Sequence, residues 1–592
     1  MTEVSTDKQR MIIVDVGSTT TKALLFEQSE QRWRLAHRGE APTTVESPFE
    51  NVQVGVRQAI GILEAVSGLQ LLAGTVTDSP GVLLSKEVNS FYATSSAGGG
   101  LKVVVCGNVR KLSALSAERA ALGAGAILLD VFGTDDGLSQ FQRLERLRDV
   151  HPDMILLSGG VEGANIINFI IEMCDFIRSV KPKSRYATQH KLPVIYAGSS
   201  SAAPIVEDLL AEAFHVQVVA NLKPNFEHEN LEPTRNAIHD VFIEHVMSNA
   251  PGYQLLKECV DAPILPTPSA VGEILTHYAR KRHMNILCVD IGGATTDVFS
   301  VLQGHFMRSV SANYGMSYSI GNVLHSAGYE RVERWLEEPM PEAELMRRVG
   351  NKLFNPTTIP AVALDLRVEQ AAAREALRMS FADHQAVGQI SERRSIFGSS
   401  LVSKQEEIRI GDFDILIGSG GVLSNAPQRA QAAAMLIDAF QPVGVTELMV
   451  DSVFMLPHLG AFSQMDEASA LHIAEQDCLV PLGTVLAPEG IFANSQLGMT
   501  LRGVTSSGRS LDCTVHIGQV QCIPLAANET ADIQLALHNG VQWQGKTNFS
   551  VRGGRVGIIV DLRGRPLPLE DSGMRYLAAW REAFEQHVGE EE

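Results

Sequence analysis

Two segments of the chain place an aspartate, glycines and threonines between apolar runs. They are MIIVDVGSTTTKALLFE at residues 11–27 and NILCVDIGGATTDVFSV at residues 285–301. In each, a glycine follows the aspartate by two residues, and a pair of threonines comes next. Such a turn brings backbone N–H groups close to an anion, and a nearby carboxylate suits Mg²⁺, which takes one or two carboxylates and keeps several waters. The two segments therefore predict a site for a nucleotide phosphate chain and its magnesium ion.

The predicted site has a magnesium part and a phosphate part. Asp15 and Asp290 are the candidate catalytic carboxylates and the candidate magnesium ligands, acting through water. Lys22 is seven residues after Asp15 and can reach the β-phosphate as a point charge. The other candidate phosphate-binding residues are Gly17, Ser18, Thr19, Thr20, Gly292, Gly293, Thr295 and Thr296.

A third glycine-rich turn follows a later apolar run. A single Asp–Gly–Thr turn is often only a polar turn in a hairpin, and it is the repeat that favours nucleotide binding. The string GSGGV at residues 418–422 could let an adenine or ribose lie against the backbone, although alone it is more typical of the entry to a helix. Other nucleotide signatures are missing, because the chain has no GxxxxGK[ST] and its GAGAIL string lacks the last glycine of GxGxxG. The candidate adenosine-binding residues are Gly418, Ser419, Gly420 and Gly421.

Composition limits the class of protein. The chain has 592 residues, 45% of them hydrophobic and 20% charged, which is typical of globular proteins and excludes collagen-like or disordered chains. The net charge of 49 − 68 = −19 argues against a nucleic-acid partner. The seven cysteines are scattered without a CxxC pair, and no uncharged apolar run reaches the roughly 18–20 residues of a membrane span. We expect a soluble cytoplasmic protein without a membrane partner.

Short apolar runs alternate with amphipathic stretches, a pattern that predicts an α/β fold with a largely parallel sheet. Because the second Asp–Gly segment restarts the pattern of the first, we expect two duplicated lobes. From about residue 481 short β-rich runs with glycine and asparagine turns replace the helical periodicity. The expected domains are a first lobe at residues 1–265, a second lobe at residues 266–480, and a β-rich domain with a terminal helix at residues 481–592.

These elements resemble the phosphate-1, phosphate-2 and adenosine motifs of the actin-like ATPase superfamily, which includes actin, Hsp70 and sugar kinases. Within it, the sequence looks most like the MutL/GlmL family, the accessory proteins of adenosylcobalamin-dependent glutamate mutase. The β-rich segment from about residue 481 exceeds that family's core length. The strings behind the resemblance are YATSSAGGGLKVVVCG (92–107), ALGAGA (121–126), PDMILLSGGVEGAN (152–165) and LPTPSAV (265–271).

The resemblance implies two RNase-H-like lobes with ATP or ADP and Mg²⁺ in the cleft between them. It also implies a reactivating chaperone that opens a cobalamin-dependent mutase, releases damaged cofactor and admits fresh cofactor. Glu162, which stands where the family pattern has Asp, is near the position that orients the attacking water, so it is a candidate general base or water-mediated magnesium ligand. The alternative for Glu162 is a cap on the helix that follows.

Two other functions remain open from the sequence. A small-molecule kinase would use the same scaffold but needs an Asp base and a polar acceptor pocket, and neither can be identified. A filament-forming or scaffold relative of actin is the second alternative. The sequence also leaves open whether the chain forms a homo-oligomer, and which substrate the partner mutase acts on.

Overall fold

The computed structural model divides the chain into two compact units. Unit 1 comprises Met1–Glu273, Ala386–Glu407 and Pro457–Ile473, and unit 2 comprises Ile274–Gln385, Ile408–Leu456 and Ala474–Glu592. The residues that the structure describes are 9–17, 20–30, 32–45, 49–74, 82–96, 101–108, 113–124, 126–163, 166–183, 191–225, 229–241, 252–311, 313–317, 319–356, 358–391, 408–490, 496–569 and 573–585.

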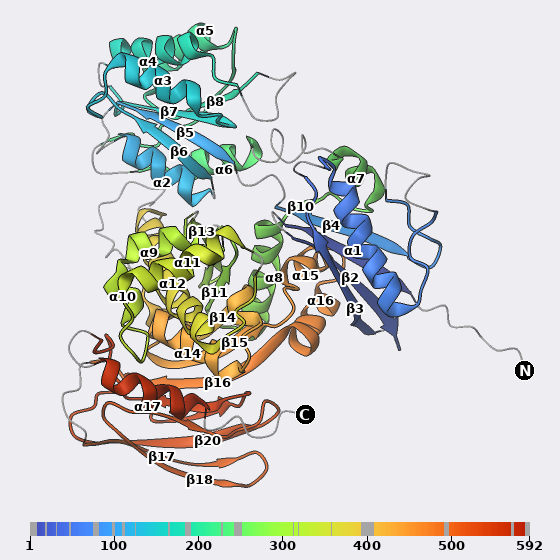
Figure 1. The fold of residues 1–592 in the computed structure, drawn as a ribbon, viewed down its shortest axis with the longest axis vertical. Coiled ribbons are helices and arrows are strands. Elements are labelled where there is room, and N and C mark those ends of the chain that lie inside the picture. The colour runs from blue at the N-terminus through green and yellow to red at the C-terminus, as the bar shows by residue number, and fades with distance from the viewer. Residues whose placement is uncertain are drawn as a thin grey trace, which may run out of the picture. The chain divides into compact units, whose positions relative to one another are not determined.

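The first lobe of unit 1 is built on a five-stranded sheet (Figure 1). Its order is β10-β4-β1-β2-β3, with β1, β2 and β3 antiparallel and β4 and β10 parallel to β1. Ile12, Val14 and Leu25 of the sheet pack with Val56 and Ile60 of α1 in one buried cluster. The elements are β1 (Arg10–Val16), β2 (Thr20–Ser29), β3 (Arg32–Pro42), α1 (Val52–Ser67), β4 (Ser90–Ser95), α7 (Tyr253–Cys259) and β10 (Leu265–Pro266).

A later segment completes the first lobe. Helices α15 (Leu456–Ser463) and α16 (Glu467–Ile473) come after most of unit 2 in the sequence, yet almost all of their residues belong to unit 1. Phe462 contacts Phe26 of β2 and Trp33 of β3, with ring centroids 6.4 and 5.9 Å apart. The close approach of Gly460 to the Ala270 carbonyl leaves no room for a side chain there.

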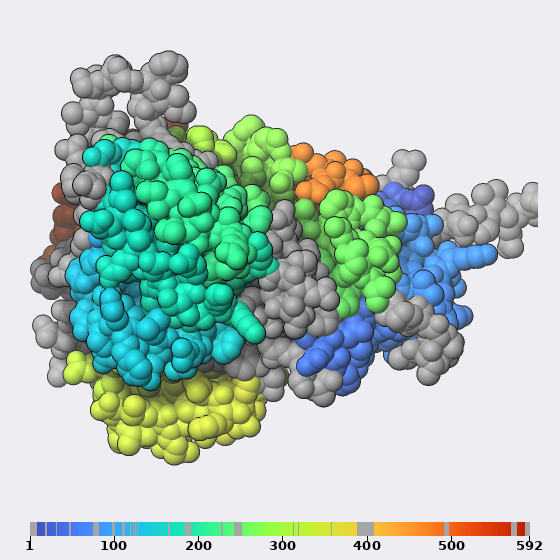
Figure 2. All heavy atoms as spheres, turned by 90° about the horizontal axis from the view of Figure 1, so that it is seen from above, coloured from blue at the N-terminus to red at the C-terminus, as the bar shows by residue number. Residues whose placement is uncertain are grey.

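The elements from β5 to α6, between β4 and α7 in the sequence, form an inserted domain with a fully parallel sheet. The order is β6-β5-β7-β8-β9, and all four strand pairs are parallel. One buried cluster joins the sheet to α2 and α6, and a second joins it to α3, α4 and α5, so helices cover both faces. Figure 2 shows the atoms of this domain, cyan to green, packed into one body. The elements are β5 (Lys102–Gly107), α2 (Leu115–Gly123), β6 (Ile127–Phe132), α3 (Gln140–Asp149), β7 (Met154–Ser158), α4 (Ile167–Val180), β8 (Pro193–Tyr196), α5 (Ala203–Leu210), β9 (His215–Val218) and α6 (Glu232–Val241).

Unit 2 repeats the first lobe's sheet. Strands β13-β12-β11-β14-β15 have the strand order and directions of β3-β2-β1-β4-β10. Leu287 and Leu416 of this sheet share a buried cluster with Ala372 of α12 and Leu436 of α14. The elements are α8 (Thr267–Arg282, which begins in unit 1), β11 (Ile286–Ile291), β12 (Thr296–Leu302), β13 (His305–Ser311), α9 (Ile320–Ala327), α10 (Tyr329–Glu333), α11 (Glu342–Phe354), α12 (Ala363–Ser391), β14 (Ile415–Ser419), α13 (Gly421–Ser424), α14 (Arg429–Phe440) and β15 (Gly444–Asp451).

The C-terminal segment extends this sheet and adds another. Three of its strands continue the order as β15-β16-β22-β19, and four others form an antiparallel sheet β18-β17-β20-β21. This agrees with the predicted fold class of two duplicated RNase-H-like α/β lobes and a C-terminal β-rich domain. The elements are β16 (Leu479–Ala487), β17 (Leu497–Thr505), β18 (Ser510–His516), β19 (Val520–Ile523), β20 (Thr530–Leu537), β21 (Asn548–Arg552), β22 (Gly557–Asp561) and α17 (Gly573–Glu585).

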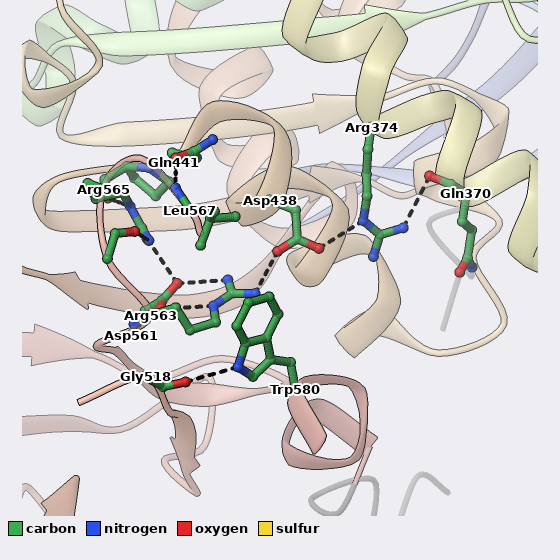
Figure 3. A network of polar contacts seen from close by, with 12 residues as sticks. Gln370, Arg374, Asp438, Gln441, Gly518, Asp561, Arg563, Arg565, Leu567 and Trp580 are labelled. Atoms are coloured by element: carbon green, nitrogen blue, oxygen red, sulfur yellow. Dashed lines mark hydrogen bonds and ion pairs between the residues drawn. The ribbon is translucent and has the colours of Figure 1, made fainter. Parts of the chain in front are cut away.

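A buried ionic network joins the C-terminal segment to the second lobe (Figure 3). The Arg563 side chain is 1% exposed and donates to Asp561 and to Asp438 of α14, each at 2.8 Å. Asp438 also accepts from Arg374 at 2.8 Å, and Asp561 from Arg565 at 2.9 Å. Burial raises the pKa of Asp561, but Arg563 and Arg565 outweigh that effect and hold the pKa well below its usual range. Each buried charge is therefore paired, as a dry interior requires.

Candidate functional site

Asp15 lies where the parallel strands of the first lobe end. It is the penultimate residue of β1 and is 6% exposed. Its Oδ1 accepts hydrogen bonds from Thr94 Oγ1 at 2.7 Å and from Thr267 Oγ1 at 2.6 Å. Thr94 is near the end of β4, and Thr267 directly follows β10 and begins α8. Two hydroxyls from neighbouring strand ends thus fix the orientation of the carboxylate.

The turn after Asp15 is tight. Gly17 N–H donates to the Thr20 carbonyl at 3.1 Å, and a Cβ on Gly17 would lie 2.7 Å from that oxygen. Thr43 Oγ1 donates to the Gly17 carbonyl at 2.8 Å. Lys22 pairs with Asp15 across the two strands, so the two side chains share one face of the sheet. Ser18 and Thr19, two candidate phosphate-binding residues, lie outside the described residues.

The second Asp–Gly turn has the same backbone geometry. Gly292 N–H donates to the Thr295 carbonyl at 2.9 Å, the counterpart of the bond from Gly17 to Thr20. The carbonyls of Gly292 and Gly293 accept from Met316 N at 2.9 Å and Ser317 N at 2.8 Å. These contacts tie the turn to the segment that follows β13.

Two side chains on the second hairpin take part in the fold itself. Thr296 is fully buried, and its hydroxyl donates to the Tyr314 carbonyl at 2.7 Å. Asp297, opposite Asp290 in the register, accepts from Arg308 Nε at 2.9 Å and Nη2 at 2.6 Å. Asp297 therefore braces the hairpin, and Asp290 is the carboxylate placed as Asp15 is.

The predicted adenosine turn lies beside the second Asp–Gly turn. Strand β14 is parallel to β11, with Ser419 opposite Asp290. Gly420 has φ +102°, and a Cβ there would lie 2.1 Å from the Ile291 carbonyl oxygen. Gly418 is the penultimate residue of β14, Ser419 is the last, and α13 begins at Gly421. Both turns thus follow the carboxyl ends of adjacent parallel strands, the edge at which open α/β sheets bind ligands.

Glu162 lies in the inserted domain, on a different sheet from Asp15. Its carboxylate accepts from Ser200 Oγ at 2.6 Å and Asn221 Nδ2 at 2.7 Å. Burial pushes its pKa upward, but these hydrogen bonds outweigh burial and lower the pKa. Helix α4 has Ile166 as its N-cap residue and no side-chain cap, so Glu162 does not have the alternative capping role. The described contacts of Glu162 link three loops of the inserted domain.

The sequence-based prediction missed Thr94 and Thr267. Both stand in strings that carry the family resemblance, TSSAGGG and LPTPSAV, but neither string indicates that its threonine contacts Asp15. A hydroxyl residue at the carboxyl end of a predicted strand is the feature that could have identified these threonines, because side chains of parallel strands converge there.

The residues around Asp15 fit a magnesium–nucleotide complex. Asp15 Oδ1 takes both hydroxyl donors, which leaves Oδ2 for a cation or its water. Across the described residues, no group of three or more His, Cys, Asp or Glu side chains could hold a metal ion. Mg²⁺ at a nucleotide needs only one or two carboxylates, because waters and phosphate oxygens complete its shell.

The two matching sheets, each with its Asp–Gly hairpin, define a duplicated actin-like α/β protein. A family model described as "MutL protein" matches residues 11–478. The chain belongs to the MutL family, which confirms the resemblance that its sequence indicated. The segment from Leu479 onward lies outside the match.

Individual proteins are similar over most of the chain. Protein MutL of Clostridium tetanomorphum is 27% identical over 484 residues, which cover 76% of this chain and 96% of that protein. The match to a nucleotide-free structure of acetone carboxylase covers 86% of this chain and 81% of that chain, with 11% identity and a TM-score of 0.36. The match to nucleotide-free diol dehydratase-reactivating factor covers 73% of this chain and 94% of that protein, with 10% identity and a TM-score of 0.30. No helix among the described residues is long and apolar enough to cross a membrane.

Proposed function

We propose that this chain is an ATP-dependent reactivating chaperone for an adenosylcobalamin-dependent carbon-skeleton mutase of the glutamate mutase type. Membership of the MutL family supports the choice of partner. The observation that carries the ATP-dependent part is the Asp15 carboxylate, oriented by Thr94 and Thr267 beside the Gly17–Thr20 turn. The matching hairpin of unit 2 supports it independently.

Each part of the proposed site has a role. Asp15 and Asp290 would hold Mg²⁺ through water, and such a cation would supply positive charge beside the triphosphate. Lys22 and the turns at Gly17–Thr20 and Gly292–Thr296 bind phosphate oxygens. Gly418, Ser419, Gly420 and Gly421 admit the adenosine, and a Cβ at Gly421 would meet nothing within 4 Å, which leaves open space beside the backbone.

The work on the partner comes from differential binding. A chaperone shifts its partner between two conformations only by as much as its affinities for them differ. ATP and ADP states of this chain must therefore prefer different states of the mutase, and by reciprocity the mutase must change the affinity for nucleotide. Hydrolysis then resets the cycle after damaged cofactor leaves.

A reactivation assay tests this proposal. A purified adenosylcobalamin-dependent glutamate mutase is blocked with cyanocobalamin and mixed with this chain, free adenosylcobalamin, Mg²⁺ and ATP. We expect mutase activity to return with ATP, to stay absent with a non-hydrolysable analogue, and to stay absent with Asp15→Asn. Arg502→Gln, which changes an arginine on β17 that is 72% exposed, serves as the control and should reactivate normally. Equal reactivation by Asp15→Asn, or none by the wild type, would contradict the proposal.

A further inference from the structure

A groove of about 640 Å³ runs between the C-terminal segment and the second lobe within unit 2. One wall, at Arg429, Glu475 and Gln476, belongs to the part matched by the family. Another wall comes from the segment beyond it and includes Arg509 and Arg555. The groove therefore exists because of the additional segment, and nothing in the ATP site uses it.

The acidic side chains of the groove already have donors. Glu475 accepts from Lys281 Nζ at 2.8 Å. Glu529 accepts from Ser507 Oγ and from Ala526 N at 3.2 Å, and these bonds lower its pKa. Arg509 Nη2 donates at 2.6 Å to the Pro524 carbonyl, while its nearest Glu529 oxygen is 4.0 Å away. Arg509 therefore has one close acceptor and keeps further N–H donors for a ligand.

The backbone around Arg555 is held in place by close packing and by a hydrogen bond. Gly553 and Gly554 precede Arg555. A Cβ on Gly553 would lie 2.0 Å from Ala526 O, and a Cβ on Gly554 would lie 2.4 Å from Gly483 N. Arg555 N–H donates to the Pro481 carbonyl at 3.0 Å. Its side chain is exposed and makes no hydrogen bond or ion pair with any residue that the structure describes. An anchored backbone with an unpaired guanidinium is a donor set available to a ligand.

We propose that this groove binds an acidic segment of a partner polypeptide, with Arg509 and Arg555 pairing with its carboxylates. A guanidinium binds a carboxylate through two parallel hydrogen bonds. The chain carries a net charge of −19. A groove in which the Arg555 side chain has no described partner, and in which Arg509 has one close acceptor, is therefore a local site of positive charge that steers an acidic segment to this place. Pro481, Pro524, Ala526 and Ala527 supply apolar wall between the charges.

The same residues argue against a nucleotide ligand. The only aromatic ring among the groove's lining residues is Phe584, which is 3% exposed and offers no free face on which a base could stack. The arginines also come from separate elements: Arg509 precedes β18, and Arg555 lies between β21 and β22. Separate cations along a wall suit an extended acidic chain.

Fluorescence anisotropy of the full chain tests the proposal. The probe is a short fluorescein-labelled peptide of alternating Glu and Leu, titrated at low ionic strength without nucleotide. We expect saturable binding that weakens with added NaCl, and an affinity about tenfold lower for Arg509→Glu and Arg555→Glu. Arg502→Glu on β17 makes the same charge change outside the groove and should bind as the wild type does. Arg555→Gln gives the test where Arg555→Glu does not fold, as judged by circular dichroism.

Two outcomes overturn the proposal. In the first, the peptide binds the wild type, the groove variants and Arg502→Glu equally. In the second, inorganic pyrophosphate displaces the peptide where NaCl of equal ionic strength does not, which would make the groove a small-anion site. Because the titration contains no ATP, its result is independent of the proposed chaperone activity.

Discussion

The hydroxyl of Thr267 donates a 2.6 Å hydrogen bond to the carboxylate of Asp15, a residue 252 positions earlier in the chain. The bond joins the start of α8 to the end of β1 and spans the whole inserted domain in sequence. Because α8 continues into unit 2, the orientation of Asp15 depends on the helix that links the two units along the chain.

Replacing Thr267 by Val should impair ATP hydrolysis without unfolding the protein. The change removes one of two donors to a buried carboxylate, and a hydrogen bond to a charged group contributes about 1.5–3 kcal/mol, so we expect a fall of about tenfold or more in turnover. Thr267→Ser keeps the hydroxyl and should retain most activity. Steady-state phosphate release measures both, and an equal loss in the two variants, or undiminished turnover in Thr267→Val, would contradict the role assigned to the hydroxyl.

Replacing Gly420 by Ala should destabilise unit 2. The new Cβ would lie 2.1 Å from Ile291 O, and φ is +102°, so we expect a loss of about 2–4 kcal/mol. Gly421 is the matched control, because a Cβ there meets nothing within 4 Å. Urea unfolding followed by circular dichroism compares the two. Gly421→Ala should keep its stability but weaken nucleotide binding, and an equally stable Gly420→Ala would contradict the packing described.

The duplicated lobes were predictable because their signals are local. Asp15 and Asp290 each stand in one short segment that contains the strand end, the glycine turn and the next strand. Both sheets confirm that interpretation. The third turn, at Gly418–Gly421, was recognisable for the same reason.

Contacts between distant segments were not predictable. Nothing local shows that Thr94 and Thr267 meet Asp15, or that Phe462 packs on Phe26. Glu162 follows an apolar strand as a catalytic carboxylate would, and that strand belongs to the inserted sheet, so its catalytic role stays a prediction. Strand pairing across long loops likewise places β19 and β22 in the sheet of the second lobe, although they are far along the chain from β11.

Replacing Asp561 by Asn should destabilise the protein at neutral pH. It should also make the free energy of unfolding depend less on pH in the acid range. The pKa of Asp561 is lowered in the folded state, so its stabilisation is present above the usual pKa of about 3.9 and is lost as pH falls below that value. Removing the charge leaves Arg563 and Arg565 underpaired in the interior, which costs about 3 kcal/mol or more. Urea unfolding between neutral pH and pH 2 measures this. Arg502→Gln, at an exposed pair, should change stability by less than about 0.5 kcal/mol.

Protonation of His384 should lower the stability of the fold at a higher pH than protonation of Asp561 does. His384 is fully buried between Ser309 Oγ, 2.8 Å from Nδ1, and Ser300 Oγ, 2.9 Å from Nε2. Burial lowers its pKa from 6.5 to about 3. The unfolded chain therefore takes up a proton that the folded chain refuses, and stability falls as pH drops from 6.5 towards 3. Unfolding midpoints of His384→Gln should vary less over this window, whereas His305→Gln, at an exposed histidine, should behave as the wild type.

Calorimetric titration of the purified chain with ATP in the presence of Mg²⁺ tests the nucleotide site most directly. We predict saturable heat for the wild type, and a loss of about tenfold or more in affinity for both Asp15→Asn and Asp290→Asn, with chelation of Mg²⁺ giving a similar loss. An absence of binding by the wild type, or equal affinity in all three proteins, would contradict the account.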